Sequence, residues 1–174
     1  YVEMASTGEV ATFGDTYPEA LLKSMMAAGF RMPKKNVLIS IGKEEGKVKL
    51  LPSVMTLYEM GYKLFATEHT ADFLKLNGIQ CEKVYKVQSD KEPSVKSLLT
   101  KGEVGLIINI PTRAFARGGA NQKESKDGYF IRRRAVDLGI PLITNRQLAE
   151  AFVSALKETT KRSIKSKHWG EYLA

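Results

Sequence analysis

The stretch Tyr62-Lys-Leu-Phe-Ala-Thr-Glu-His-Thr70 decides the fold of this chain, because a predicted strand passes directly into a predicted helix here. Tyr62–Ala66 is a short apolar run typical of a buried strand. A helical apolar pattern begins at Asp72–Leu76, so Thr67 and Thr70 lie at the junction. Backbone N–H groups at a helix N-terminus point outward and bind anions, most often phosphate. The alternative for these threonines is an ordinary helix N-cap.

Strands and helices alternate on both sides of this stretch. The apolar runs predict strands at Asn36–Ile41, Tyr62–Ala66, Ile79–Tyr85, Val104–Ile110 and Pro141–Thr144. Helices are predicted at Pro18–Ala28, Lys47–Met60, His69–Leu76, Ser94–Lys101, Tyr129–Leu138 and Arg146–Thr159. Such alternation predicts a parallel sheet with helices on both faces, and the weakly apolar third strand is expected at a sheet edge. The polar stretch Thr112–Gly128 has no apolar period, so we expect it to be functional or disordered.

The composition narrows the class of protein. The chain has 174 residues and a net charge of +8, which indicates one domain with short appendages and an anionic partner. Nucleic acid, a nucleotide and an acidic domain all meet that description. No apolar run approaches the roughly 20 residues of a membrane span. A single cysteine, Cys81, excludes an internal disulfide framework and suits a reducing compartment.

Cations, hydroxyls and amides follow the predicted strands. Ligands of parallel sheets bind outside the carboxyl ends of the strands, so these side chains are expected to share one site. The candidate binding residues are Lys47, Thr67, Thr70, Lys86, Asn109 and Thr112. Lysine is a point-charge partner for phosphate, and the amide of Asn109 can both donate to and accept from a base or sugar. The alternative for each lysine is a solvated surface charge.

The sequence lacks the motifs of several catalytic and cofactor-binding classes. It contains neither the glycine fingerprint of dinucleotide-binding folds nor a P-loop. Neither His69 nor His168 is placed as a general base, and with one cysteine they do not form a zinc site. Three arginines at 132–134 fan around a predicted helix; we expect one to pair with Asp137 or a carbonyl and another to add positive potential near the site. No aromatic residues are interleaved with the basic ones, so nucleic acid is not the expected partner.

Five segments resemble one family. Glu3–Val10 resembles the end of the second ATP-grasp half of carbamoyl-phosphate synthetase large subunits. The segments Gly29–Lys35, Leu64–Asp72, Leu106–Pro111 and Ile131–Asn145 resemble the C-terminal regulatory domain of the same enzymes, which belongs to the methylglyoxal-synthase-like group. The resemblance implies an ATP-grasp end over residues 1–14, a regulatory domain over 15–160 and a basic, aromatic tail over 161–174.

The resemblance implies an α/β fold, a three-layer Rossmann-like domain with a five-stranded parallel sheet flanked by helices. It places effector phosphate contacts at Lys47, Thr67, Thr70 and Lys86, and base or sugar contacts at Asn109 and Thr112. The effector expected is UMP, UTP, IMP or phosphoribosyl pyrophosphate. The domain itself is expected to be non-catalytic and without metal or cofactor, in a glutamine-hydrolysing parent that uses ATP and magnesium. Implied partners are the ATP-grasp domains and a glutaminase domain or subunit, with no membrane or nucleic acid; a homo-oligomer stays an open alternative.

Other functions compete with this expectation. Urea-cycle relatives bind N-acetylglutamate, but they carry an aromatic residue at the position of Lys86 and an asparagine at that of Gly128. The resemblance is nearer to the eukaryotic synthetase of pyrimidine biosynthesis than to the mitochondrial urea-cycle form, which implies a cytoplasmic protein rather than a mitochondrial one, with arginine biosynthesis as a second pathway. The tail with Trp169 and Tyr172 resembles a chain that stops without a following dihydroorotase, so the architecture of the parent protein stays open. A free-standing enzyme of the same fold is the third alternative. Methylglyoxal synthases use catalytic aspartates, and the expected one is missing after Asn109-Ile-Pro111.

Overall fold

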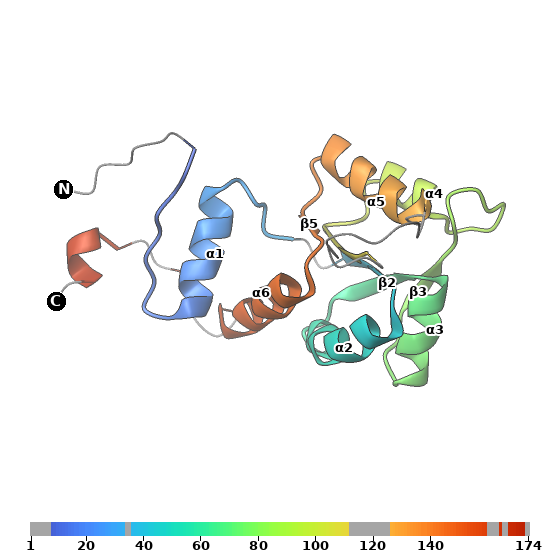
Figure 1. The fold of residues 1–174 in the computed structure, drawn as a ribbon, viewed down its shortest axis with the longest axis horizontal. Coiled ribbons are helices and arrows are strands. Elements are labelled where there is room, and N and C mark those ends of the chain that lie inside the picture. Colours follow the sequence, from blue (N-terminus) through green and yellow to red (C-terminus); the bar gives the residue numbers. More distant parts are fainter. Residues whose placement is uncertain (1–7, 34–35, 112–125, 160–163, 165–166, 173–174) are drawn as a thin grey trace, which may run out of the picture. The chain divides into compact units, whose positions relative to one another are not determined.

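The computed structural model describes residues 8–33, 36–111, 126–159, 164 and 167–172. The chain divides into two compact units. One unit consists of Tyr1–Met32 and Ala151–Ala174, and the other consists of Pro33–Glu150 (Figure 1). Most of the predicted loop Thr112–Gly128 lies outside the described residues, as does the candidate binding residue Thr112.

The second unit contains a five-stranded sheet in which every pair of neighbouring strands is parallel. Its strands are β1 (Asn36–Ile41), β2 (Lys63–Thr67), β3 (Glu82–Val84), β4 (Leu106–Ile110) and β5 (Leu142–Ile143). Their order in the sheet is β3-β2-β1-β4-β5, so β3 lies at an edge as predicted. The predicted α/β class and five-stranded parallel sheet are confirmed.

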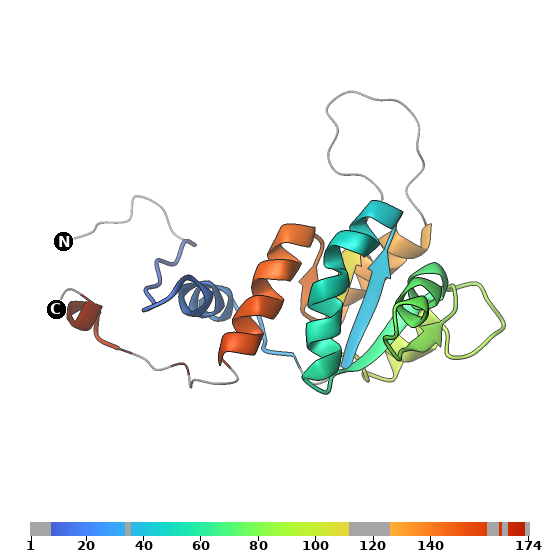
Figure 2. The ribbon, with the colours of Figure 1, turned by 90° about the horizontal axis from the view of Figure 1, so that it is seen from below.

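Helices cover both faces of the sheet, which gives three layers (Figures 1 and 2). On one face lie α2 (Glu44–Glu59) and α3 (Glu68–Leu76), and on the other lie α4 (Val95–Thr100) and α5 (Lys126–Asp137). Figure 2 shows α2 in front of β1. The core between the sheet and the second pair of helices is apolar; it contains Leu38, Phe65, Val84, Val95, Leu98, Leu99, Ile107, Ile131 and Ala135. A further helix, α6 (Arg146–Thr159), begins and ends at the predicted residues.

Two helices, α2 and α5, begin three residues earlier than the sequence predicted. α2 begins at Glu44 rather than Lys47, because two glutamates in its first turn complement the positive end of the helix dipole and outweigh the flexibility of Gly46. Pro52 therefore lies inside the helix, beyond the first turn, which is where a proline does least harm. Likewise α5 begins at Lys126 rather than Tyr129 and includes Gly128. The last residues of the predicted loop are therefore helical.

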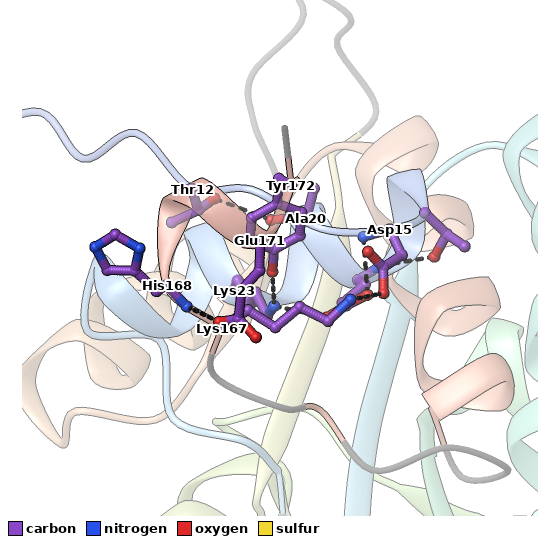
Figure 3. A network of polar contacts seen from close by, with 10 residues as sticks. Thr12, Asp15, Ala20, Lys23, Lys167, His168, Glu171 and Tyr172 are labelled. Carbon is purple, nitrogen blue, oxygen red and sulfur yellow. Dashed lines mark hydrogen bonds and ion pairs between the residues drawn. The ribbon is translucent and has the colours of Figure 1, made fainter. Parts of the chain in front are cut away.

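The first unit contains α1 (Tyr17–Ala27) and a short 3₁₀ helix, η1 (Trp169–Tyr172). Polar contacts join the segment that carries η1 to the region of α1 (Figure 3). Lys23 Nζ donates to the hydroxyl of Tyr172 at 2.7 Å, and Lys167 forms an ion pair with Asp15. The ring of Tyr172 also lies 5.9 Å from that of Phe13, centroid to centroid. These contacts fix the two ends of the described chain to each other within one unit.

Candidate functional site

A row of polar side chains crosses three strands at the carboxyl edge of the sheet. Successive side chains of a strand point to opposite faces, so residues two apart share a face. The core residues Leu38, Phe65 and Ile107 are therefore followed on the same face by Ser40, Thr67 and Asn109. Ser40 is the register partner of Asn109, and its Oγ lies 3.3 Å from Oγ1 of Thr67. We call Ser40, Thr67 and Asn109 the polar row.

Thr67 and Thr70 meet where β2 passes into α3, as the sequence predicted. Their Oγ1 atoms are 3.4 Å apart. Thr67 occupies the N-cap position of α3, yet its hydroxyl makes no capping hydrogen bond, so the ordinary N-cap interpretation does not account for it. Thr70 is only 1% exposed, and its Oγ1 accepts a hydrogen bond of 3.1 Å from the N–H of Ile41 at the end of β1. The hydroxyl of Thr70 therefore also joins α3 to the sheet.

The two candidate lysines differ in their surroundings. Lys47 is 9% exposed; its Nζ lies 3.2 Å from a carboxylate oxygen of Glu44 and 5.8 Å from the ring centroid of Phe73. Because Phe73 is three residues after Thr70 on α3, the ammonium of Lys47 lies beside the first turns of that helix. Lys86 is exposed, two residues beyond β3, and no ion pair of its ammonium occurs within the described part of the chain.

The buried amide of Asn109 contacts a helix that the sequence did not connect with it. Asn109 is 2% exposed, and its Oδ1 accepts a hydrogen bond from Nη1 of Arg132 on α5. Burial lowers the pKa of the Arg132 guanidinium from its ordinary value, although arginine stays charged in proteins. Arg133 pairs with Asp137 at 3.1 Å, which confirms the expected structural role for one arginine of the three. Arg132 is the arginine that reaches the candidate site.

A second contact joins the start of α5 to the segment that carries Lys86. The side chain of Asp127 accepts a hydrogen bond of 3.4 Å from the N–H of Val87. Two residues of this edge, Ser40 and Asp127, were not among the predicted site residues. One of the three arginines was expected near the site, and only the structure identifies it as Arg132. Only Ser40 carried a signal that could have identified it, since it is a polar residue two positions beyond a core residue in the same strand.

The side chains gathered here are suited to binding an anion. Hydroxyl, ammonium and amide groups supply hydrogen-bond donors, and Thr112, which would have added another, lies outside the described residues. His69 is exposed on α3, and burial raises the pKa of the Cys81 thiol, which disfavours the reactive thiolate. Over the residues that the structure covers, no three or more His, Cys, Asp or Glu side chains form a group able to hold a metal ion. Nor does that part of the chain contain a helix long and apolar enough to cross a membrane.

Comparison with known proteins gives one family and a consistent group of relatives. The family described as "MGS-like domain" matches residues 49–144. This range includes Thr67, Thr70, Lys86 and Asn109, and Lys47 lies just before it.

Three relatives cover nearly all of the chain. It is 45% identical to the multifunctional protein URA2 of Saccharomyces cerevisiae over 177 residues, which cover 96% of the chain. It is 46% identical to the multifunctional protein pyr-3 of Neurospora crassa over 159 residues, or 89% of the chain. It is also 40% identical to the human carbamoyl-phosphate synthase [ammonia], mitochondrial, over 177 residues, or 99% of the chain. The chain spans only 8%, 9% and 11% of the lengths of these three proteins.

Proposed function

Since this chain belongs to the family of MGS-like domains, we propose that it is a regulatory domain that binds a phosphorylated nucleotide or phosphoribosyl compound at the carboxyl edge of its sheet. The proposed ligands are UMP, UTP, IMP and phosphoribosyl pyrophosphate. In this proposal the ligand phosphate contacts Lys47, Thr67, Thr70 and Lys86, and the rest of the ligand extends toward Asn109. The domain binds and does not catalyse.

The observation that carries this proposal is the cluster of donors around the start of α3. The hydroxyls of Thr67 and Thr70 are 3.4 Å apart, and Lys47, a residue only 9% exposed, places its ammonium beside the same helix. A phosphate has enough oxygens to accept from several such groups at once, whereas a carboxylate has two. Charge-assisted hydrogen bonds to an ionised ligand are shorter and stronger than neutral ones. A helix N-terminus adds its positive dipole to the same anion.

We further propose that the domain controls the synthesis of carbamoyl phosphate by the protein to which it belongs. The parent would use bicarbonate, ATP with magnesium, and ammonia released from glutamine, through ATP-grasp domains and a glutaminase domain or subunit. This step rests on the human relative, which is named a carbamoyl-phosphate synthase. Control of this kind requires that the nucleotide bind two states of the parent with different affinity. Substrates of the parent must then shift the affinity for the nucleotide by the same factor.

Calorimetry on the 174-residue chain tests the ligand class. Wild type should bind at least one of UMP, UTP, IMP and phosphoribosyl pyrophosphate, and a ligand at a hundred times its Kd should stabilise the fold by about 2.7 kcal/mol. Lys47→Ala and Lys86→Ala should each weaken that binding about tenfold to a hundredfold, because a hydrogen bond to a charged group contributes roughly 1.5–3 kcal/mol. Lys49→Ala is the matched control, since Lys49 is an exposed lysine of the same helix as Lys47 and pairs with Glu45.

Two results would contradict the proposal. Binding of N-acetylglutamate, with no binding of any of the four phosphorylated compounds, would replace the proposed ligand with the one expected of urea-cycle relatives. Turnover of dihydroxyacetone phosphate by the chain would show that it is a free-standing enzyme rather than a binding domain.

A further inference from the structure

The side chain of Asn109 is almost completely buried, and among the described residues only one end of its amide has a partner. Its Oδ1 accepts from Arg132, and within the described part of the chain no acceptor is found for its Nδ2. Every fully buried side-chain nitrogen or oxygen among the described residues does have a partner. Nδ2 therefore opens onto solvent, although Asn109 as a whole is only 2% exposed.

The chemistry of Arg132 determines which end of the amide can face it. A guanidinium carries only donors, so it can pair with the amide oxygen and not with the amide NH₂ group. The opposite orientation of the amide would place its NH₂ group against the N–H groups of Arg132. Both are donors, and a buried donor without an acceptor costs free energy. The position of Nδ2 thus follows from the identity of residue 132 and from the contact between α5 and β4.

We propose that Arg132 is a positioning residue that locks the amide of Asn109 so that its NH₂ group faces the ligand. This inference rests on the proposed function and makes it more specific. The group of the ligand next to Asn109 must then be a hydrogen-bond acceptor, such as a carbonyl, hydroxyl or phosphate oxygen. An N–H or NH₂ group of a ligand at this position would meet a donor and be rejected. In this role Arg132 acts through Asn109.

The polar row gives the locked amide its place in the site. Asn109 is the register partner of Ser40, whose Oγ lies 3.3 Å from that of Thr67. The hydroxyls of Ser40 and Thr67 can rotate to donate or accept, whereas the amide of Asn109 is fixed by its buried partner. Asn109 is therefore the member of the polar row that can distinguish a hydrogen-bond acceptor of the ligand from a hydrogen-bond donor.

A double-mutant cycle with UMP as the probe tests the proposal. Arg132→Met keeps an unbranched apolar side chain but removes the donors, so calorimetry should show UMP affinity about tenfold weaker. Arg132→Lys should stay within about threefold of wild type, because an ammonium is also a donor only. In an Asn109→Ala background, Arg132→Met should change the affinity by less than about twofold, since a residue that acts through Asn109 has nothing left to position. An equal loss in both backgrounds would overturn the proposal.

Asn109→Asp separates the roles of the two ends of the amide, because it keeps the oxygen that accepts from Arg132 and removes the NH₂ group. A carboxylate still accepts from Arg132, so the thermal midpoint should be at least that of wild type. The same change replaces the NH₂ donor with an acceptor, so UMP affinity at pH 7 should fall at least about tenfold. Undiminished UMP binding by this variant would show that the donor is not used, and the proposal would fail.

A ligand-free measurement separates this inference from the proposed function. The side-chain NH₂ resonances of Asn109 in nitrogen-15 spectra are identified by their loss in Asn109→Ala. They should move toward free-amide positions in Arg132→Met and stay near wild type in Arg132→Lys. Unmoved resonances in Arg132→Met would refute the lock. If the wild-type chain binds no phosphorylated compound, the proposed function fails, and these spectra alone decide the role of Arg132.

Discussion

Replacing Thr70 by valine should destabilise the fold, although the two side chains have nearly the same shape. Thr70 is 1% exposed, and its hydroxyl accepts from the N–H of Ile41 at the last residue of β1. In Thr70→Val that N–H is left buried without an acceptor, which costs about 1–3 kcal/mol. For a chain of this length, each kcal/mol lowers the thermal midpoint by roughly 2–4 °C, so we expect a fall of about 2–12 °C.

Two further variants separate the contribution of this hydrogen bond to the free energy of unfolding from the contribution of side-chain packing. Thr70→Ser keeps the hydroxyl and loses one buried methyl group, a cost of about 0.8 kcal/mol for the apolar surface alone. Thr100→Val makes the same chemical change at an exposed position of α4, where surface substitutions usually stay within about 0.5 kcal/mol. Urea unfolding followed by circular dichroism measures all three free energies. If Thr70→Val unfolds at the same urea concentration as Thr100→Val, the structural role assigned to this hydroxyl is wrong.

Replacing Thr67, unlike replacing Thr70, should affect nucleotide affinity more than stability. The hydroxyl of Thr67 contacts the hydroxyls of Ser40 and Thr70, at 3.3 and 3.4 Å, and it does not cap α3. Thr67→Ala should therefore cost about 1 kcal/mol of nucleotide affinity, or roughly fivefold, with a smaller change in stability than Thr70→Val. Calorimetry and urea unfolding on the same preparations measure both. A Thr67→Ala variant that loses more stability than affinity would contradict this assignment.

The first unit gives two further predictions. Tyr172→Phe keeps the ring but removes the acceptor of the 2.7 Å bond from Lys23, so the free energy of unfolding should fall by about 0.5–1 kcal/mol; an unchanged urea midpoint would contradict this. The hydrogen bond from Lys167 holds the pKa of Asp15 below its ordinary value of 3.8. The stabilisation that this ion pair gives the folded state is therefore fully present above the ordinary pKa of Asp15, and it is lost as the pH falls through the lowered pKa of the folded state. Between pH 5 and pH 2, the urea midpoint of wild type should fall more than that of Asp15→Asn; parallel curves would contradict this.

Local sequence was sufficient to identify the elements of the sheet and the start of α3. The run Asn36–Ile41 is apolar and β-branched between polar neighbours, and its predicted bounds match β1. Thr67 and Thr70 could be identified because a strand end and a helix start lie within a few residues of each other. Such signals depend on neighbours in sequence, so they remain readable without the tertiary structure.

The remaining features depend on contacts between distant residues. Three consecutive arginines point in different directions around a helix, and only packing decides that Arg132 reaches Asn109, which is 23 residues away in sequence. The same holds for Lys167, which pairs with Asp15 across 152 residues. The start of α2 was predicted three residues too late for a local reason, because Gly46 disfavours helix whereas the acidic first turn favours it. Lys47 consequently lies within α2 and is nearly buried, where the sequence suggested the first residue of the helix.

The site draws its residues from helices on both faces of the sheet, and this bears on how a ligand could regulate. Thr70 belongs to α3 and Lys47 to α2 on one face, whereas Arg132 holds Asn109 from α5 on the other. Inorganic phosphate could bind beside α3 without using Asn109, and so would connect the helices of one face only. A ligand that carries a sugar or base beyond its phosphate could contact both groups of residues at once. A ligand shifts an equilibrium only by its difference in affinity for the two states. A compound that contacts the helices on both faces can therefore differ more in affinity between two arrangements of those helices than phosphate alone can.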